Sequence, residues 1–323
     1  MLASCTCRDR ETRVSCRSVI GARLVSHSAQ SQLDTTEESR GVHMTILVTG
    51  ATGTIGGAVV PRLVEAGQKV RALTRDASRA EGLHPSTEIA EGDLGDPEGM
   101  RRALHGVDRM YLFADSENVE ETLTAVEECG VRRLVVLTSP LGNEEDQNGK
   151  TYNVVKAAVR ARSLDWTFVE PGPFSMNARD WWAAQIQFTG AVNWVYPEAA
   201  LAPIHEEDIA DLIAQALLED GHIGQAYEIS GPEILTQREQ VNIIGDVLGR
   251  AIPFHDIGQV EARNMMVSHG VPSEIAHWVL EVLAERARVP THATNPVERF
   301  TGRPGRTFAQ WVSEHADDFR TPG

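Results

Sequence analysis

Three residues in the middle of the chain have the types and spacing needed for acid–base chemistry on a carbonyl oxygen: Ser139, Tyr152 and Lys156. Tyr152 stands four residues before Lys156, which places both side chains on one face of a helix. A free tyrosine has a pKa of about 10, and a neighbouring ammonium would lower that pKa. Tyr152 could then protonate a carbonyl oxygen as hydride arrives, while Ser139 holds the same oxygen. The alternative is an ordinary amphipathic tyrosine and a surface helix charge.

A glycine-rich loop supplies the second candidate site. Gly50, Gly53 and Gly56 form the pattern G-x-x-G-x-x-G, between an apolar stretch at 45–49 and a stretch of helical composition at 58–66. Small residues here allow a tight turn and let backbone N–H groups approach a pyrophosphate at the positive end of a helix. The strand before and the helix after predict a dinucleotide site rather than a purely structural turn.

The end of the second strand indicates which cofactor is bound. The stretch 69–74 reads as a strand and is followed by Arg75 and Asp76. A carboxylate at this place favours NAD(H), whereas a guanidinium suits the 2′-phosphate of NADP(H). We expect NADP(H) to be preferred, with NAD(H) as the alternative, and Asp76 as a group able to restrain Arg75. A solvated loop charge is the other interpretation of Arg75.

Another carboxylate follows the next predicted strand, at 87–90. Asp93 and Leu94 stand just after it. At that position a carboxylate can accept a hydrogen bond from the adenine amino group while an apolar neighbour packs on the ring. Aspartate before a turn is common by itself, so the position after the strand carries this prediction.

These sites need strands and helices that alternate along the chain. Strands are also expected at 109–113, 133–138 and 166–169, with helices at 97–104, 119–128 and 150–162. This alternation predicts an α/β protein with a Rossmann-type, doubly wound parallel sheet.

Three segments are expected along the chain: an unstructured leader at 1–43, an NAD(P)-binding Rossmann domain at 44–174, and a smaller mixed substrate cap at 175–323 that returns some chain to the sheet. Residues 1–43 resemble a transit peptide faintly; the favoured alternative is an upstream start with Met44 as the functional beginning. Within the cap, short strands are expected near 192–195 and 227–229, and helices near 208–218, 237–248 and 273–287.

Composition excludes several classes of partner. The 323 residues carry a formal net charge of −16, which argues against a surface built for nucleic acid or an anionic membrane. No apolar run approaches the roughly 18 residues of a transmembrane helix. Cys5, Cys7 and Cys16 lie in the leader, and Cys129 is the one cysteine of the remaining 307 residues. This is no disulfide framework, and it fits a reducing, cytoplasmic location.

Two further features have competing interpretations. The run His205-Glu206-Glu207-Asp208 suggests a metal site, but acids in the first turn of a helix also complement its dipole, and we expect no metal. Trp181 and Trp182 either wall a pocket for an aromatic or polycyclic substrate or belong to the core of the cap.

Several motifs together resemble the NmrA-like, atypical short-chain dehydrogenase/reductase family. They are Thr49-Gly50-Ala51-Thr52-Gly53-x-Ile55-Gly56, Arg75, Asp93-Leu94, Asp165-Trp166-Thr167-Phe168, Pro171-Gly172-x-Phe174, Asn177, Ile204-His205-x-x-Asp208-Ile209-Ala210 and Thr301-Gly302-Arg303-Pro304-x-Arg306-Thr307-Phe308. The resemblance covers nearly all of 44–323. It implies a Rossmann domain with a small cap, in a family that includes quinone reductases, triphenylmethane dye reductases, benzylic ether reductases and non-catalytic cofactor sensors.

The resemblance also implies roles for individual residues. The pyrophosphate would meet Gly50, Thr52, Gly53, Thr54, Ile55 and Gly56, the 2′-phosphate Arg75, and adenine Asp93 and Leu94. The nicotinamide would be flanked by Phe113 and by the segment from Pro171 to Phe174, and the substrate would meet Phe174, Asn177 and Trp181.

Two departures from the family pattern bear on function. Many members have arginine where this chain has Glu170, and many lack the Tyr152–Lys156 pair that marks the wider superfamily. The pair favours an enzyme: an NADPH-dependent oxidoreductase that reduces a carbonyl, quinone or related conjugated small molecule, with Tyr152 as the proton donor. A cofactor-sensing regulator with a protein partner and a redox-neutral isomerase or dehydratase are the alternatives. The oligomeric state stays open.

Overall fold

The computed structural model describes residues 44–113, 116–140, 147–289, 291–294 and 296–321, and the statements below concern these residues. The expected leader at 1–43 lies outside them. Within the described residues, no helix is long and apolar enough to cross a membrane.

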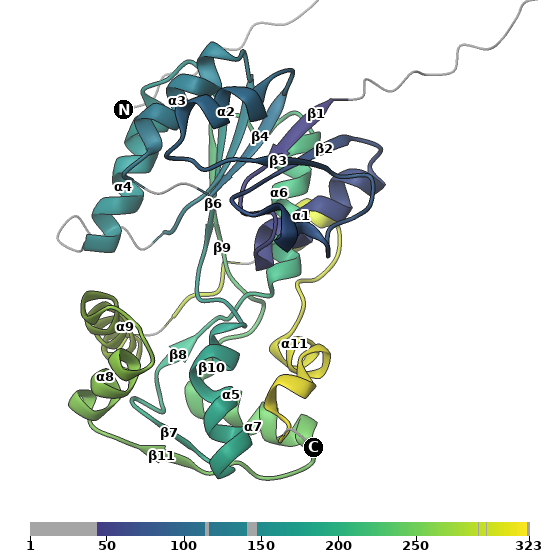
Figure 1. The fold of residues 1–323 in the computed structure, drawn as a ribbon. Helices are drawn as coiled ribbons and strands as arrows, with labels where there is room; N and C mark the ends of the chain where they lie inside the picture. The colour runs from purple at the N-terminus through teal and green to yellow at the C-terminus, as the bar shows by residue number, and fades with distance from the viewer. Residues whose placement is uncertain (1–43, 114–115, 141–146, 290, 295, 322–323) are drawn as a thin grey trace, which may run out of the picture. The chain divides into compact units, whose positions relative to one another are not determined.

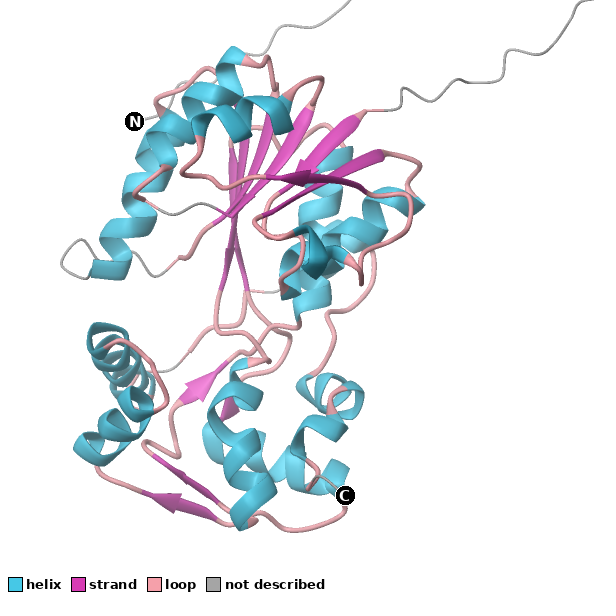
Figure 2. Cartoon of the chain, in the orientation of Figure 1, coloured by secondary structure: helices cyan, strands magenta, loops and turns pink. Residues whose placement is uncertain are grey.

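A parallel sheet of seven strands, in the order β3-β2-β1-β4-β5-β6-β9, forms the centre of the fold (Figures 1 and 2). The strands are β1 (Thr45–Val48), β2 (Lys69–Thr74), β3 (Glu88–Glu91), β4 (Arg109–Phe113), β5 (Arg133–Leu137), β6 (Asp165–Pro171) and β9 (Gln225–Ile229). The order reverses between β1 and β4, and in such sheets ligands bind at the carboxyl ends of the strands beside that reversal. The predicted doubly wound α/β fold is confirmed.

Helices cover both faces of the sheet (Figure 1). One face packs on α1 (Thr54–Glu65) and α6 (Glu206–Leu218), and the other packs on α2 (Pro97–Leu104), α3 (Val119–Glu128) and α4 (Gln147–Arg160). The alternation of strand side chains explains the two layers. In β1, for example, Ile46 and Val48 point to the first core and Leu47 to the second.

Helix α1 begins at Thr54, four residues before the stretch of helical composition at 58–66. Composition missed this first turn because glycine disfavours helices, and positions 56 and 57 are both glycine. The turn forms nevertheless because Gly56 packs directly on the backbone of the loop before it.

Most of the chain after Phe174 packs around a second hydrophobic core. Its fully buried aromatic side chains include Trp182, Trp194 and Trp311. It is built from α5 (Asn177–Thr189), β7 (Val192–Trp194), β8 (Ala200–Leu201), β10 (Leu235–Thr236), α7 (Gln237–Leu248), β11 (Phe254–Asp256), α8 (Gln259–Ser268), α9 (Ser273–Arg286) and α11 (Phe308–Glu314). The pairs β8–β10 and β7–β11 form two small sheets. We call this region the cap.

The chain returns from the cap to the central sheet. Between β8 and β10 it forms α6 and β9, and β9 pairs in parallel with β6 from Thr167 to Pro171. A short helix, α10 (Pro296–Thr301), then packs against α6 and β9 before the chain enters α11.

Candidate functional site

The glycine loop joins β1 to α1 at the reversal of strand order. Gly50 has φ +59°, a conformation that favours glycine, and its carbonyl accepts a hydrogen bond from the N–H of Gly53 at 2.9 Å. A Cβ on Gly56 would lie 2.3 Å from that carbonyl oxygen, so the helix can approach the loop only with glycine there. Gly53 offers no side-chain cap, which leaves the first N–H groups of α1 suited to an anion.

Thr49 fixes the loop to the neighbouring strand. Its hydroxyl donates to the carbonyl of Tyr111 at 3.1 Å and accepts from the N–H of Phe113 at 2.8 Å. The contact ties the ends of β1 and β4 together and holds the half-exposed Phe113 beside the loop. The sequence analysis gave Thr49 no role of its own, although a hydroxyl between a strand and a glycine loop is a usable signal.

Two cavities, of about 390 and 430 Å³, share Thr49, Gly50, Thr52, Arg75, Arg79 and Phe113. The first also contains, among others, Asp93, Leu94 and Tyr152, and the second contains Gly53, Thr54, Ile55, Gly56, Leu137, Phe174 and Met176. The structure thus brings most of the expected cofactor residues, with Tyr152, around one connected region. Neither lining includes Pro171, Ser139, Lys156, Asn177 or Trp181.

Arg75 stands at the mouth of both cavities with its side chain 79% exposed. Its Nε lies 3.8 Å from Oδ2 of Asp93. Asp76 does not restrain it, because Oδ1 of Asp76 accepts from the N–H of Ser78 at 3.0 Å and from its hydroxyl at 2.7 Å. These hydrogen bonds hold the pKa of Asp76 below its ordinary value. They also begin a short 3₁₀ helix, η1 (Ala77–Ala80), which carries Arg79, a cation that the sequence analysis missed.

Asp93 is half-exposed and turns the chain after β3. Its Oδ1 accepts from the N–H of Gly95 at 2.8 Å, and the half-buried side chain of Leu94 faces the first cavity beside it. Asp93 therefore lines the cavity, where its carboxylate contacts the Gly95 amide and the Arg75 guanidinium.

Lys156 forms an ion pair that the sequence analysis did not foresee. Its Nζ donates to Oε1 of Glu170 at 3.1 Å and to the carbonyl of Ser139 at 3.2 Å. The side chains of Lys156 and Glu170 are each only 12% exposed. Thr138 adds a contact from its hydroxyl to Oε1 of Glu170 at 3.4 Å. We call the contact between Lys156 and Glu170 the β6 ion pair, since Glu170 lies on β6 one residue before Pro171.

The β6 ion pair changes the expectation for Tyr152. The sequence argument has Lys156 lowering the pKa of the phenol, whereas burial raises the pKa of Tyr152 in the structure. The physical reason is that the phenol is desolvated where it lines the first cavity, and the ammonium of Lys156 lies against the carboxylate of Glu170. Burial therefore favours the protonated phenol of Tyr152 over the phenolate.

The expected nicotinamide and substrate residues follow β6. Phe174 faces the second cavity and pairs with Ile204 through an isolated β-bridge, while Pro171 is buried at the end of β6. Asn177 begins α5. Trp181 is half-buried, packs against the core of the cap, and stacks on the buried Trp194 with ring centroids 5.5 Å apart. This packing matches the core interpretation of Trp181 more closely than a pocket wall.

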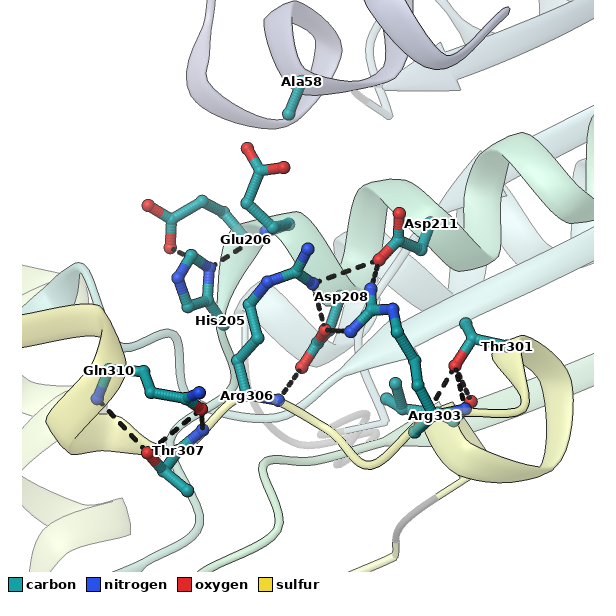
Figure 3. Close-up of polar contacts among 12 residues, drawn as sticks. Ala58, His205, Glu206, Asp208, Asp211, Thr301, Arg303, Arg306, Thr307 and Gln310 are labelled. Atoms are coloured by element: carbon teal, nitrogen blue, oxygen red, sulfur yellow. Dashed lines mark hydrogen bonds and ion pairs between the residues drawn. The ribbon is translucent and has the colours of Figure 1, made fainter. Parts of the chain in front are cut away.

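The run from His205 to Asp208 builds structure at the start of α6 (Figure 3). Nδ1 of His205 accepts from the N–H of Glu207 at 3.1 Å and caps the helix. Asp208 is fully buried and takes ion pairs from Arg303 and Arg306, which both also reach Asp211. Among the described residues, no group of three or more His, Cys, Asp or Glu side chains could hold a metal ion.

Helix α1 joins the same set of charges. Arg62 donates from Nε to Asp211 and from Nη2 to Glu207, each at 2.5 Å. We call Arg62, Asp208, Asp211, Arg303 and Arg306 the α6 ion-pair cluster. It links the helix after the glycine loop, α6 and the segment that leads into α11.

Comparison with known proteins places these features in a family. Residues 50–220 match a family model described as NAD(P)H-binding. The chain is 36% identical over 282 residues to a (4-alkanoyl-5-oxo-2,5-dihydrofuran-3-yl)methyl phosphate reductase of Streptomyces griseus, covering 85% of this chain and 99% of that protein. It is 34% identical over 286 residues to an NAD(P)H azoreductase of Xenophilus azovorans, with coverages of 85% and 99%.

Solved structures of lower identity share the fold. A triphenylmethane reductase of Citrobacter sp. superposes with a TM-score of 0.72 at 20% identity, over 84% of this chain and 99% of the other. An NADPH-dependent quinone oxidoreductase of Escherichia coli, in complex with NADPH, superposes with a TM-score of 0.74 at 19% identity and the same coverages.

Proposed function

Since the chain belongs to the NAD(P)H-binding, NmrA-like family of oxidoreductases, we propose that it uses NADPH to reduce a carbonyl, quinone or related conjugated small molecule. Its family makes it an NAD(P)H-dependent oxidoreductase. The proposal adds the phosphorylated cofactor, the class of acceptor and a proton donor, Tyr152. The observation that carries it is the presence of Tyr152 in one cavity with the glycine loop, Arg75 and Asp93.

The residues around the cavities fit a dinucleotide. The glycine loop approaches its own helix so closely that a single Cβ at position 56 would collide with it, which leaves backbone N–H groups facing the cavities. Arg75 and Arg79 offer two cations to a 2′-phosphate, while Asp93 and Leu94 offer an acceptor and an apolar surface to adenine. When bound, the reduced nicotinamide supplies the hydride.

The protonation state of Tyr152 favours the direction of reduction. A phenol whose pKa is raised by burial keeps its proton around neutral pH, so it donates a hydrogen bond and then a proton to an acceptor oxygen. It is poorly suited to remove a proton from an alcohol under the same conditions. The lining of the second cavity includes Tyr111, Phe113, Leu137, Phe174 and Met176, which suits a flat conjugated acceptor beside the cofactor.

The names of relatives agree with such an acceptor. They include an azoreductase and, at 23% identity over 288 residues, quinone oxidoreductase 2 of Escherichia coli. Azo groups and quinones are conjugated and gain a hydride and a proton on reduction, which is the chemistry proposed for this site.

The test begins with the full chain, titrated with NADPH and NADH while nicotinamide fluorescence is followed. A panel of quinones, ketones and azo compounds is then added, and oxidation of the reduced cofactor is followed by absorbance. We expect tight NADPH binding and acceptor-dependent oxidation. Tight binding without oxidation of NADPH by any acceptor would favour the sensor, and turnover without net NADPH loss would favour the isomerase.

The proton donor is tested by Tyr152→Phe. This variant should lose about 100-fold or more in turnover and keep its affinity for NADPH, because the substitution removes only the hydroxyl that donates the proton to the acceptor. Tyr227→Phe is the matched control, since Tyr227 lines neither cavity and its hydroxyl contacts His222 instead. Full activity of Tyr152→Phe would show that the proton comes from elsewhere.

A further inference from the structure

We propose that Glu170 is a positioning residue that fixes the ammonium of Lys156 at the edge of the sheet and balances its charge, so that the site presents a protonated Tyr152 to the acceptor. This inference rests on the proposed function and adds to it the residue that sets the working pH range. Glu170 acts here through Lys156, not by touching the substrate.

Three contacts from three elements hold the β6 ion pair. Lys156, on α4, donates to Glu170 on β6 and to the carbonyl of Ser139, which follows β5. Thr138 stands beside Glu170 because Leu137 and Val169 are partners in the parallel register, and its hydroxyl donates to the same carboxylate oxygen. The ammonium therefore has a defined position at the carboxyl ends of β5 and β6.

Burial makes the charge balance necessary. The side chains of Lys156 and Glu170 are each 12% exposed, so neither charge is well solvated by water. A buried charge is tolerated when a group of opposite charge lies against it, and each member of the β6 ion pair has the other. Tyr152 lies one helical turn before Lys156 on α4, and the two opposite charges of the pair, 3.1 Å apart, act on it in opposite directions.

Other charged groups line the same cavity as Tyr152. They are Arg75, Asp76, Arg79 and Asp93. Arg75 lies within ion-pair distance of Asp93, and Asp76 is the acceptor of two hydrogen bonds from Ser78, with Arg79 nearby on the same turn. These groups include two cations and two carboxylates, and none of them changes when Glu170 is substituted.

Removal of the Glu170 charge therefore has a defined sign. An uncompensated ammonium one helical turn from Tyr152 favours phenolate, so the pKa of Tyr152 should fall from the raised value that burial gives it. A reductase that needs the phenol is active below that pKa and loses activity as the pH rises through it. The alkaline loss of activity should thus move to lower pH.

The experiment is a pH titration of Glu170→Gln in the full chain. The absorbance of phenolate is measured for each protein and for the same protein carrying the additional substitution Tyr152→Phe. The difference between the two absorbances is the phenolate signal of Tyr152. We expect the midpoint in Glu170→Gln to lie about one pH unit below that of the parent protein. The alkaline limb of kcat/KM for NADPH-dependent reduction should move by the same amount, a shift that a merely structural role would not produce.

Two further variants separate charge from packing. Thr138→Val removes one contact to Glu170 without a change of charge and should leave the midpoint in place. The double variant Lys156→Met/Glu170→Gln has neither charge and should return the midpoint towards that of the parent. If Glu170→Gln does not fold, Lys156→Met replaces it, and its uncompensated carboxylate should raise the midpoint.

An unchanged midpoint in folded Glu170→Gln, or in Lys156→Met where that variant replaces it, would overturn the inference. The phenolate titration needs no turnover, so it decides the inference even if no acceptor is reduced. Absence of turnover in the parent protein would instead contradict the proposed function. The two failures are therefore distinguishable.

Discussion

The α6 ion-pair cluster and the β6 ion pair both bury charge, but they differ in how many partners each charge has and in what lies beside them. In the α6 cluster, Asp208 is fully buried and shared by two guanidinium groups, and Arg62 and Asp211 extend the set. In the β6 ion pair, one ammonium meets one carboxylate, close to a cavity that contains Tyr152. The sequence suggested chemistry at both places.

The difference shows which buried charges can serve catalysis. A carboxylate enclosed by several cations has its position fixed by structure, and breaking such a set destabilises the fold. A single pair beside a cavity can instead transmit a change of charge to a neighbouring titratable group.

The largest effect is expected on stability from Asp208→Asn. Arg303 and Arg306 lose the charge of their shared buried carboxylate, which should lower the free energy of unfolding by about 3 kcal/mol. Urea unfolding measures the change, and NADPH affinity of the folded variant should be kept. Asp317→Asn, which removes an ion pair with a 91% exposed carboxylate, is the control and should change stability little. A loss as small as that of the control would show that the α6 cluster is not structural.

The next effect concerns the glycine loop. In Gly56→Ala the new methyl group would lie 2.3 Å from the Gly50 carbonyl oxygen, and the loop must move away from the pyrophosphate position. We expect affinity for NADPH and NADH alike to fall by about tenfold to a hundredfold, measured by nicotinamide fluorescence. Gly57→Ala, with a nearest contact of 3.3 Å, is the matched control. If both variants bind NADPH and NADH as tightly as the parent protein, the glycine loop is not part of the cofactor site.

A smaller effect separates the two cofactors. Arg75→Glu should weaken NADPH more than NADH by about tenfold, because a carboxylate at this place repels a 2′-phosphate. The ratio of the two dissociation constants is the measurement. Arg132→Glu is a matched charge reversal, since its side chain is 77% exposed against 79% for Arg75 and it lies before β5. Equal losses for both cofactors would refute the phosphate role of Arg75.

The smallest effect lies at the far end of the α6 cluster. Thr307 follows Arg306 and caps α11 in a reciprocal arrangement with Gln310. Thr307→Ala should lower the free energy of unfolding by about 1 kcal/mol without a change in NADPH affinity. Ser313→Ala is the control, because it removes a hydroxyl on the same helix that donates to the carbonyl of Ala309. A change in NADPH affinity would contradict this prediction, because it would mean that this end of the α6 cluster influences cofactor binding.

The sequence predicted the parts of the molecule whose signals are local. The strand, glycine loop and helix from Thr45 onwards follow from adjacent residues, and so does the alternation that produces the parallel sheet. Helix α5 was not predicted because its apolar residues are spread around the helix and form no single apolar face. Helix α8 was not predicted because most of its residues are exposed. Their existence depends on packing within the cap.

Site residues divide in the same way. Gly50 to Gly56 and Arg75 are placed by short-range patterns. The partnership of Lys156 and Glu170, fourteen residues apart, depends on the register of β5 and β6 and on where α4 packs, which no spacing encodes. The raised pKa of Tyr152 follows from its burial in the folded protein, so reasoning from the Tyr-x-x-x-Lys spacing alone gave the opposite direction.

The return of the chain to the sheet through α6 and β9 limits how this architecture can acquire new specificities. A region inserted at one point can be exchanged between relatives by two crossovers. Here the cap core is assembled from segments on both sides of β9, and α10 again contacts α6 before α11 rejoins the cap. A chimera that exchanges the cap must therefore match several junctions at once. Point substitutions along the cavity walls are the more accessible route to a different acceptor.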